Sequence, residues 1–295
     1  MNRKYSFGLQ KKDKWVKQTI MVEISKNAEN KLNVLEKWYA QRKGSIVAFS
    51  GGIDSTLVLF LARKFQGKEN AIGVISNSES LKKKDFDLAR SICNEFDIWL
   101  EVIKTNEISD ERYNSNPLDR CFFCKDHLYN DLGTVKEKYP SFDVLNGTNY
   151  DDFADYRPGL KAAAKYEILS PMADCLVTKE ELRQIARHFN LPNWDKPASP
   201  CLSSRVPYNH AITAKKLQQI EDAENILNDF GFGEVRVRHY DTFGKIEVPQ
   251  KDIERLILIE DEIAGKLKTL GFEKCVIDTE GLVSGKLNRV INKQE

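Results

Sequence analysis

The chain has 295 residues, of which 41% are hydrophobic and 30% are charged, as in ordinary globular proteins. Its 45 lysines and arginines nearly balance its 44 aspartates and glutamates, which disfavours nucleic acid as the main partner, although a local basic groove can exist in a neutral chain. No apolar run approaches the roughly 18 residues of a membrane span, the N-terminus lacks the apolar core of a signal peptide, and the six cysteines do not make a disulfide framework. We therefore expect a cytoplasmic protein that does not enter a membrane.

Strands and helices alternate along the first two thirds of the chain. Short apolar runs rich in β-branched residues predict strands, and amphipathic stretches predict helices. In chain order, we predict a helix within 22–43, a strand at 45–49, a helix near 56–62, a strand at 71–75, a helix at 82–96, a strand at 99–103, a helix at about 127–139, a strand at 143–146, a helix at 159–166, a strand at 167–170 and a helix at 179–189. This alternation predicts an α/β fold with a doubly wound parallel sheet.

A proline-rich stretch at 191–209 separates this pattern from a second one. Its four prolines are incompatible with a regular helix or a central strand, so we predict a loop that also carries site residues. Beyond it we predict a helix at about 212–230, strands at 234–239 and 245–248, a helix at 250–270 and a strand at 275–277. The chain therefore divides into an N-terminal extension (1–20), an α/β domain (21–207) and a smaller α+β domain (208–295).

A glycine-rich loop follows the first predicted strand. Gly51 and Gly52 allow the backbone to turn tightly and to direct several N–H groups inward, and the following helix adds the positive end of its dipole. Such a loop suits a phosphate group, which the hydroxyls of Ser50 and Ser55 could also bind, while Asp54 could hold Mg²⁺. The loop matches neither the GxxxxGK(S/T) pattern nor the GxGxxG pattern of common nucleotide-binding loops. The alternative is a glycine turn that merely joins strand to helix.

Three cysteines stand where their thiols could act together. Cys121 and Cys124 form a CxxC pair just before a predicted helix, and Cys201 lies on the proline-rich loop. A CxxC pair brings two sulfurs close enough to share a metal or to form a disulfide. A zinc site that adds His127, and thiols that only pack, are the alternatives. Of the remaining cysteines, Cys93 and Cys275 are expected to lie in the core, and the role of Cys175 is left undecided.

The segment 50–55, placed between a strand and a helix, resembles the PP-loop of the N-type ATP pyrophosphatases. Members of that family, which include GMP synthetases, NAD synthetases and tRNA sulfur transferases, release pyrophosphate from ATP and form an adenylated intermediate. The resemblance implies that ATP and Mg²⁺ bind at this loop. It also implies that the end of the second strand, from Ser76 to Ser78, cups the adenosine, although a simple turn at these residues is equally expected.

Several further segments resemble the LarE-type sulfur transferases, a branch of this superfamily. The matching stretches extend over about 30–250 and are 50–55, 120–125, 146–152, 156–159, 170–171, 194–198 and 201–208. The resemblance implies an enzyme that adenylates a carboxylate of pyridinium-3,5-biscarboxylic acid mononucleotide and converts it to a thiocarboxylate for the nickel-pincer nucleotide cofactor. It further implies ATP contacts by Gly147 and Thr148, a substrate-binding and oligomerisation role for 208–295, and a homo-oligomer based on trimers. The sulfide or persulfide donor stays open.

LarE-type proteins use two sulfur routes. One sacrifices a single cysteine, which matches Cys201 here and ends as dehydroalanine. The other holds a 4Fe-4S cluster on three cysteines, so that one iron lacks a protein ligand and can carry an extra sulfide. Because Cys121 and Cys124 accompany Cys201, we predict the cluster route with these three residues as ligands. Sacrifice of Cys201 is the alternative.

Arginines are the candidates for binding the phosphate of the nucleotide substrate, because a planar guanidinium matches phosphate with two parallel hydrogen bonds. The candidates are Arg205, Arg236 and Arg238. The last two alternate along one predicted strand and should therefore lie on one face, where a solvated charged surface is an equal alternative. A further anion and metal site is predicted among loop residues that are otherwise plain surface charges: Asp151, Asp152 and Arg157.

Other functions compete with sulfur transfer to a carboxylate. A tRNA thiolation enzyme shares the PP-loop and sometimes the three cysteines, but the neutral charge and the lack of a recognisable tRNA-binding module weigh against it. A metal-binding or scaffold protein would keep the fold without turnover. Glutamine-dependent amidation is disfavoured, because no glutaminase domain accompanies the loop and the cysteines would be idle.

Overall fold

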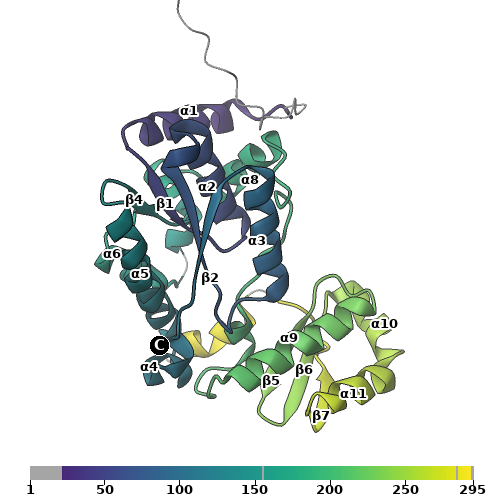
Figure 1. The fold of residues 1–295 in the computed structure, drawn as a ribbon. Coiled ribbons are helices and arrows are strands. Elements are labelled where there is room, and N and C mark those ends of the chain that lie inside the picture. Colours follow the sequence, from purple (N-terminus) through teal and green to yellow (C-terminus); the bar gives the residue numbers. More distant parts are fainter. Residues whose placement is uncertain (1–21, 155, 284, 294–295) are drawn as a thin grey trace, which may run out of the picture.

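The computed structural model describes residues 22–154, 156–283 and 285–293, so the predicted extension at 1–20 lies outside the described residues. The larger part of the fold is built on a four-stranded sheet with the strand order β3-β2-β1-β4 (Figure 1). All pairings in it are parallel. The strands are β1 (Ser45–Ala48), β2 (Ala71–Ser76), β3 (Trp99–Ile103) and β4 (Asp143–Leu145). The parallel α/β fold predicted from the alternating pattern is confirmed.

Both faces of this sheet are covered, which explains why its central strands are apolar throughout. Successive residues of a strand point to opposite faces, so Ile46 and Val47 of β1 belong to two different hydrophobic cores. The core with Val47 draws on α1 (Lys26–Ala40), α2 (Ile53–Gln66), α3 (Lys83–Glu95) and α8 (Lys179–His188). The core with Ile46 draws on α5 (Arg120–Lys138) and α6 (Gly159–Lys165).

A second, three-stranded sheet forms in the C-terminal part (Figure 1). Its order is β5-β6-β7, with an antiparallel hairpin between β5 and β6 and a parallel pairing between β6 and β7. Its elements are α9 (Ala214–Asp229), β5 (Arg236–Tyr240), β6 (Phe243–Glu247), α10 (Ile253–Ile257), α11 (Glu260–Thr269) and β7 (Lys274–Ile277). Helices α9, α10 and α11 pack on this sheet around a separate core that contains Val237 and Ile246.

The remaining elements are short. They are the α-helical turns α4 (Glu111–Asn114) and α7 (Pro171–Asp174) and the 3-10 segments η1 (Lys68–Asn70), η2 (Glu107–Ser109), η3 (Tyr150–Ala154), η4 (Leu202–Arg205), η5 (Gln250–Asp252) and η6 (Lys286–Lys293). Within the described ranges, no helix is both long and apolar enough to cross a membrane.

Three predicted elements differ from the structure. The strand expected at 167–170 contributes only one bridge, between Leu145 and Leu169, because Glu167 has a φ of 54° and α7 begins at Pro171. The helix expected at 250–270 is divided between α10 and α11, although no proline or glycine marks the break. Helix α5 begins at Arg120, so the CxxC pair lies inside its first turns rather than before it.

Candidate active site

The glycine loop, residues 50–55, turns directly from β1 into α2. Gly51 has a φ of +70°, and a Cβ atom there would lie 2.7 Å from the backbone oxygen of Asp85, so only glycine fits. The hydroxyl oxygens of Ser50 and Ser55 lie 3.2 Å apart. Gly52 caps α2 without a side-chain hydrogen bond among the described residues. The first amides of the helix and the positive end of its dipole are therefore available to an anion.

A cavity of about 350 Å³, the nucleotide cavity, opens beside this loop. The predicted ATP-binding residues that line it are Ser50, Gly52, Asp54, Ser55, Ser76, Gly147 and Thr148. Gly51 is absent from this lining, since it faces Asp85. Gly147 approaches the loop so closely that a Cβ atom would lie 2.7 Å from the amide nitrogen of Ser55. The Ser76 hydroxyl contacts that of Thr105 at 2.6 Å. Three segments that are far apart in the chain thus form one wall.

Asp54 is held by an ion pair that the sequence does not predict. The ammonium of Lys179 lies 2.5 and 2.6 Å from the two carboxylate oxygens of Asp54, and the Asn149 side chain donates to one of them at 3.1 Å. Lys179 is the first residue of α8, which Thr178 caps. The start of this helix therefore brings a positive charge to the glycine loop. A single lysine at a helix start carries no sequence signal of such a role.

The loop charges predicted near this site are brought to it. Asp152 and Arg157 form an ion pair of 2.7 Å and both line the nucleotide cavity. Asp151 accepts a hydrogen bond from the backbone of Lys179 at 2.8 Å. Burial raises the pKa of Asp152, and the negative charge of Asp54 adds to that shift. The region near Asp54 thus offers further carboxylate oxygens, the donors that Mg²⁺ prefers.

The three predicted sulfur residues lie on the walls of two adjoining cavities. Cys124 and Cys201 line this cavity, and Cys121 lines the cavity next to it. Burial raises the pKa of Cys124 to about 12, against the opposing effect of the Lys125 charge. Among the described residues, no three His, Cys, Asp or Glu side chains are arranged to hold a metal ion. A set of three thiols is nevertheless the donor chemistry that an iron–sulfur cluster requires.

The other sulfur and imidazole groups have separate roles. The Nε2 atom of His127, the residue that the alternative zinc site would add, lies 2.8 Å from a carboxylate oxygen of Asp110. Cys93 and Cys175 are buried in the core that contains Val47. Cys275 is half-buried against the C-terminal core. The core positions expected for Cys93 and Cys275 agree with the structure, and Cys175 joins them.

A second cavity of about 630 Å³, the cationic cavity, adjoins the first. The residues common to both walls are Lys125, Tyr129, Asn146, Thr148 and Arg157. The described lining of the cationic cavity contains no carboxylate, and its cations are Arg120, Lys125, Arg157, Arg236, Arg238 and Lys286. A wall of this kind attracts a ligand with several negative charges.

Lys125 stands on the wall of both cavities. Burial lowers its pKa, but the hydroxyl of Tyr129 and the thiols of Cys124 and Cys121 raise it, and the net shift is upward. The ammonium group therefore stays charged at neutral pH, at the place where ligands of the two cavities would meet. Its position after the CxxC pair did not distinguish it from an ordinary helix lysine.

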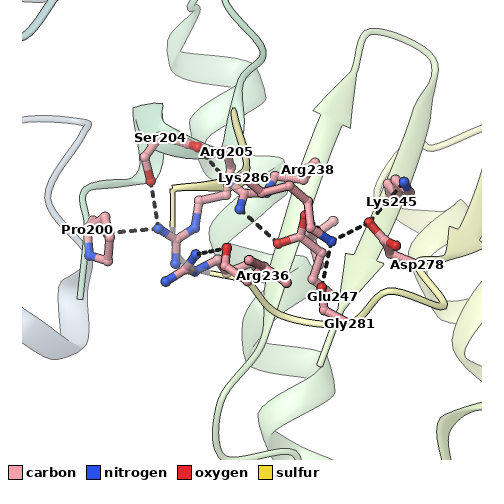
Figure 2. Close-up of polar contacts among 12 residues, drawn as sticks. Pro200, Ser204, Arg205, Arg236, Arg238, Lys245, Glu247, Asp278, Gly281 and Lys286 are labelled. Atoms are coloured by element: carbon pink, nitrogen blue, oxygen red, sulfur yellow. Dashed lines mark hydrogen bonds and ion pairs between the residues drawn. The ribbon is translucent and has the colours of Figure 1, made fainter. Parts of the chain in front are cut away.

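Arg236 and Arg238 lie on the same face of β5, as their alternation predicts, and both line the cationic cavity (Figure 2). Arg238 donates to the carboxylate of Glu247 at 2.8 Å and to the carbonyl of Ser204 at 2.7 Å, and its Nε has no hydrogen-bond partner among the described residues. Burial lowers the pKa of Arg236, and the charges of Arg238 and Arg205 lower it further. Positive charge is therefore concentrated here, and a bound anion would reduce the repulsion between the guanidinium groups.

Arg205 differs from the other two arginines. It is 2% exposed, its Nε contacts Glu224 at 2.7 Å, and its Nη1 donates to the carbonyls of Pro200 at 2.9 Å and Cys201 at 3.3 Å. It does not line the cationic cavity. A buried guanidinium needs a carboxylate partner, which Glu224 supplies. The Arg205 guanidinium in turn stabilises the loop that carries Cys201. The structure therefore gives Arg205 a structural role in place of the predicted phosphate contact.

The C-terminal segment completes the wall of the cationic cavity. Lys286 lies 2.8 Å from Asp278 and 3.7 Å from Glu247, so it joins the charge network of β6 (Figure 2). The hydroxyl of Tyr208 donates to Asn288 at 3.0 Å. Sequence reasoning missed this segment, because its polar residues show no periodicity or motif that points to a site.

Several known proteins have sequences similar to this chain. Residues 26–118 match the NAD synthase family model. The chain is 39% identical over 269 residues to an uncharacterised protein of Synechocystis sp., a match that covers 90% of this chain and 99% of that protein. It is 34% identical over 249 residues to the pyridinium-3,5-bisthiocarboxylic acid mononucleotide synthase of Lactiplantibacillus plantarum, covering 84% of this chain and 90% of that enzyme. An uncharacterised protein of Methanocaldococcus jannaschii is 32% identical over 260 residues, which is 88% of this chain and 98% of that protein.

The glycine loop lies within the segment that matches the NAD synthase model, and the similarity to the Lactiplantibacillus enzyme covers 84% of this chain. Because that identity exceeds 30% over most of both chains, the protein belongs to the LarE family of PP-loop proteins.

Proposed function

We propose that this protein is a cytoplasmic, ATP-dependent sulfur transferase. In this proposal it adenylates a carboxylate of pyridinium-3,5-biscarboxylic acid mononucleotide, releases pyrophosphate, and converts the carboxylate to a thiocarboxylate for the nickel-pincer nucleotide cofactor. The observation that carries it is the meeting of the nucleotide cavity and the cationic cavity beside Cys121, Cys124 and Cys201. The substrate would present a phosphate and two carboxylates to a wall whose described charges are all positive.

Adenylation is the first step. A carboxylate oxygen of the substrate attacks the α-phosphorus of ATP, the bond from that phosphorus to the bridging oxygen breaks, and pyrophosphate leaves with the electron pair. The amides at the start of α2 and the ammonium of Lys179 would stabilise the charge that develops on the pyrophosphate. Asp54, Asp151 and Asp152 would hold Mg²⁺, which supplies charge neutralisation to the phosphates when it is bound.

Sulfur transfer is the second step. A sulfur nucleophile adds to the carbonyl carbon of the acyl-adenylate, and AMP leaves with the electrons of the carbon–oxygen bond. Lys125 would stabilise negative charge on the carbonyl oxygen, because it stands on the wall that both cavities share. Arg236 and Arg238 would bind the substrate phosphate at the other end of the cationic cavity.

Cys121, Cys124 and Cys201 would hold a 4Fe-4S cluster, which supplies sulfide when it is bound. The placement of three thiols on the walls of the two adjoining cavities supports this assignment. The alternative is that Cys201 is itself the donor. After acyl transfer to its sulfur, a base would remove the Cα proton, the Cα=Cβ bond would form, and the thiocarboxylate would leave with the electrons of the Cβ–Sγ bond, so that dehydroalanine remains. In the same proposal, residues 208–295 form the substrate-binding and oligomerisation domain of a trimer-based homo-oligomer.

The direct test of the function is pyrophosphate release. We expect the protein to release pyrophosphate from ATP only when the pyridinium biscarboxylate mononucleotide is present, and to form AMP and a thiocarboxylate when sulfide is added. Release that depends on tRNA, together with salt-sensitive tRNA binding, would favour a tRNA thiolation enzyme instead. Absence of release with either substrate would contradict an enzymatic role.

The cluster assignment predicts iron in the isolated protein. After anaerobic purification we expect a brown protein that contains about four irons and a similar amount of acid-labile sulfide. Cys124→Ser should lose both, because it removes one of only three ligands, whereas Cys275→Ser should keep both. Stoichiometric zinc without iron would contradict the assignment.

The phosphate assignment predicts a selective binding defect. Arg236→Ala should raise the KM for the nucleotide substrate about 10-fold to 100-fold, the usual effect of removing a charged hydrogen bond, and leave the KM for ATP unchanged. Lys245→Ala is the matched control, since Lys245 contacts Asp278 on the same sheet and is absent from the cavity lining. An equal change in both KM values would place the phosphate elsewhere.

A further inference from the structure

Asp85 holds the loop that leads to Cys201. Asp85 lies in the first turn of α3 and is 5% exposed. One of its carboxylate oxygens accepts the ammonium of Lys196 at 2.8 Å, and the other accepts the hydroxyl of Ser199 at 2.8 Å. Cys201 is only two residues beyond Ser199, on a stretch without a regular helix or strand. Arg205 holds the carbonyls of Cys201 and of the residue before it from the other side. The position of this exposed thiol therefore depends on both sets of contacts, and Asp85 supplies those that precede it.

The same loop is also fastened to the glycine loop. The side-chain amide of Asn193 donates to the carbonyl of Gly51 at 3.0 Å and to the hydroxyl of Thr56 at 2.9 Å. Asn193 is 2% exposed, so both hydrogen bonds are shielded from water. Asp85 contributes here too, since its backbone oxygen lies against Gly51. Residues 193–199 are thus bound to the glycine loop at one end and to α3 at the other.

We infer that Asp85 is a positioning residue that sets the distance between the sulfur of Cys201 and the nucleotide held by the glycine loop. This inference rests on the proposed function, because it concerns the transfer of sulfur to an adenylated substrate. Asp85 lines neither the nucleotide cavity nor the cationic cavity, so it acts through Lys196 and Ser199 and does not touch the reacting groups. Its role belongs to the second step of the reaction.

The magnitude of the effect follows from geometry. An attacking atom must lie within about 3–3.5 Å of the carbonyl carbon, and a displacement of 1 Å costs about 100-fold in rate. Asn193 holds the first part of the loop, but without the Asp85 contacts the residues from 196 to 201 lose their anchor to α3. We therefore expect loss of Asp85 to affect sulfur transfer much more than adenylation.

The test compares the two steps in one variant. In single-turnover reactions, Asp85→Asn should lower the amount of thiocarboxylate formed per pyrophosphate released by about 10-fold or more. Asp87→Asn is the matched control, because Asp87 lies on the same helix, is exposed, and has no hydrogen bond or ion pair among the described residues. Its ratio should equal that of the unmodified protein. Lys196→Met should reproduce the Asp85→Asn ratio.

Three results would overturn the inference. One is an unchanged ratio in both Asp85→Asn and Lys196→Met. Another is an equal loss of both steps together with a lower melting temperature, which would mean that Asp85 only stabilises the fold. The third comes from backbone hydrogen exchange, which should be faster at residues 196–204 in Asp85→Asn than in Asp87→Asn. Equal exchange would show that the loop is not held by Asp85, whatever the catalytic outcome. Failure of the unmodified protein to release pyrophosphate would instead refute the proposed function.

Discussion

Asp54→Ala should reduce pyrophosphate release from ATP by about 10³-fold or more, because it removes a proposed ligand of the Mg²⁺ that would neutralise the negative charge on the leaving pyrophosphate. The carboxylate is placed for this role by contacts with Lys179 at 2.5 and 2.6 Å and with Asn149 at 3.1 Å. The Asp54 and Lys179 side chains are 29% and 36% exposed, so their ion pair contributes at most about 1 kcal/mol to the free energy of unfolding. The variant should therefore fold normally.

A second ion pair on the same protein provides the control. Asp97 contacts Lys68 at 2.7 Å, its side chain is 54% exposed, and it lies on neither cavity wall. Asp97→Asn should leave pyrophosphate release unchanged, because asparagine removes the charge and tolerates the φ of 50° at this position. Thermal unfolding should be similar for both variants. Undiminished release by Asp54→Ala would remove the ATP-site assignment, and a large drop in its melting temperature would attribute the loss to unfolding.

Cys201→Ala should lower the rate of thiocarboxylate formation by about 10³-fold or more and preserve pyrophosphate release. Both sulfur routes need this thiol, either as a cluster ligand or as the donor itself. Adenylation needs the glycine loop and the cationic cavity, whose groups stay in place when one exposed thiol is removed. The acyl-adenylate should then accumulate or hydrolyse, so pyrophosphate and AMP would appear without sulfurated product.

Two companion measurements separate the sulfur routes. Cys275→Ala should retain full sulfur transfer, because this thiol packs against the C-terminal core. Cys124→Ala should lose sulfur transfer if a cluster is the source and keep it if Cys201 is sacrificed. Mass spectrometry of the Cys201 peptide after turnover should show an intact cysteine in the first case and dehydroalanine in the second. Normal product formation by Cys201→Ala would contradict both routes.

The fold class and the glycine loop at the end of β1 could be predicted because their signals are local. The glycine loop stands between an apolar strand and a helix within twenty residues, so the motif and its structural context are contiguous in the sequence. The carboxyl ends of parallel strands meet at one edge of a sheet, which brings Ser76 and Gly147 to the loop once the alternation of strands and helices is recognised. The one-face placement of Arg236 and Arg238 follows from strand period in the same way.

The predictions that differ from the structure concern residues whose role or conformation depends on a neighbour that is distant in the sequence. Arg205 resembles the other two arginines in the sequence, but burial makes an unpaired guanidinium costly, and Glu224 on α9 supplies the compensating charge. The helix predicted at 250–270 is divided between Ile257 and Glu260, where the sequence has neither proline nor glycine, because packing of α10 and α11 around one core sets its path.

The sequence alone therefore determined the class of fold, the glycine loop between strand and helix, and which three thiols are the candidates for sulfur chemistry, since hydrophobic period, turn chemistry and motif spacing act over a few residues. Only the tertiary structure decided which charges complete the site. Lys179 meets Asp54 across 125 positions of the chain, and Lys196 meets Asp85 across 111. An ion pair depends on distance in space and on burial, and neither is encoded in the residues beside it.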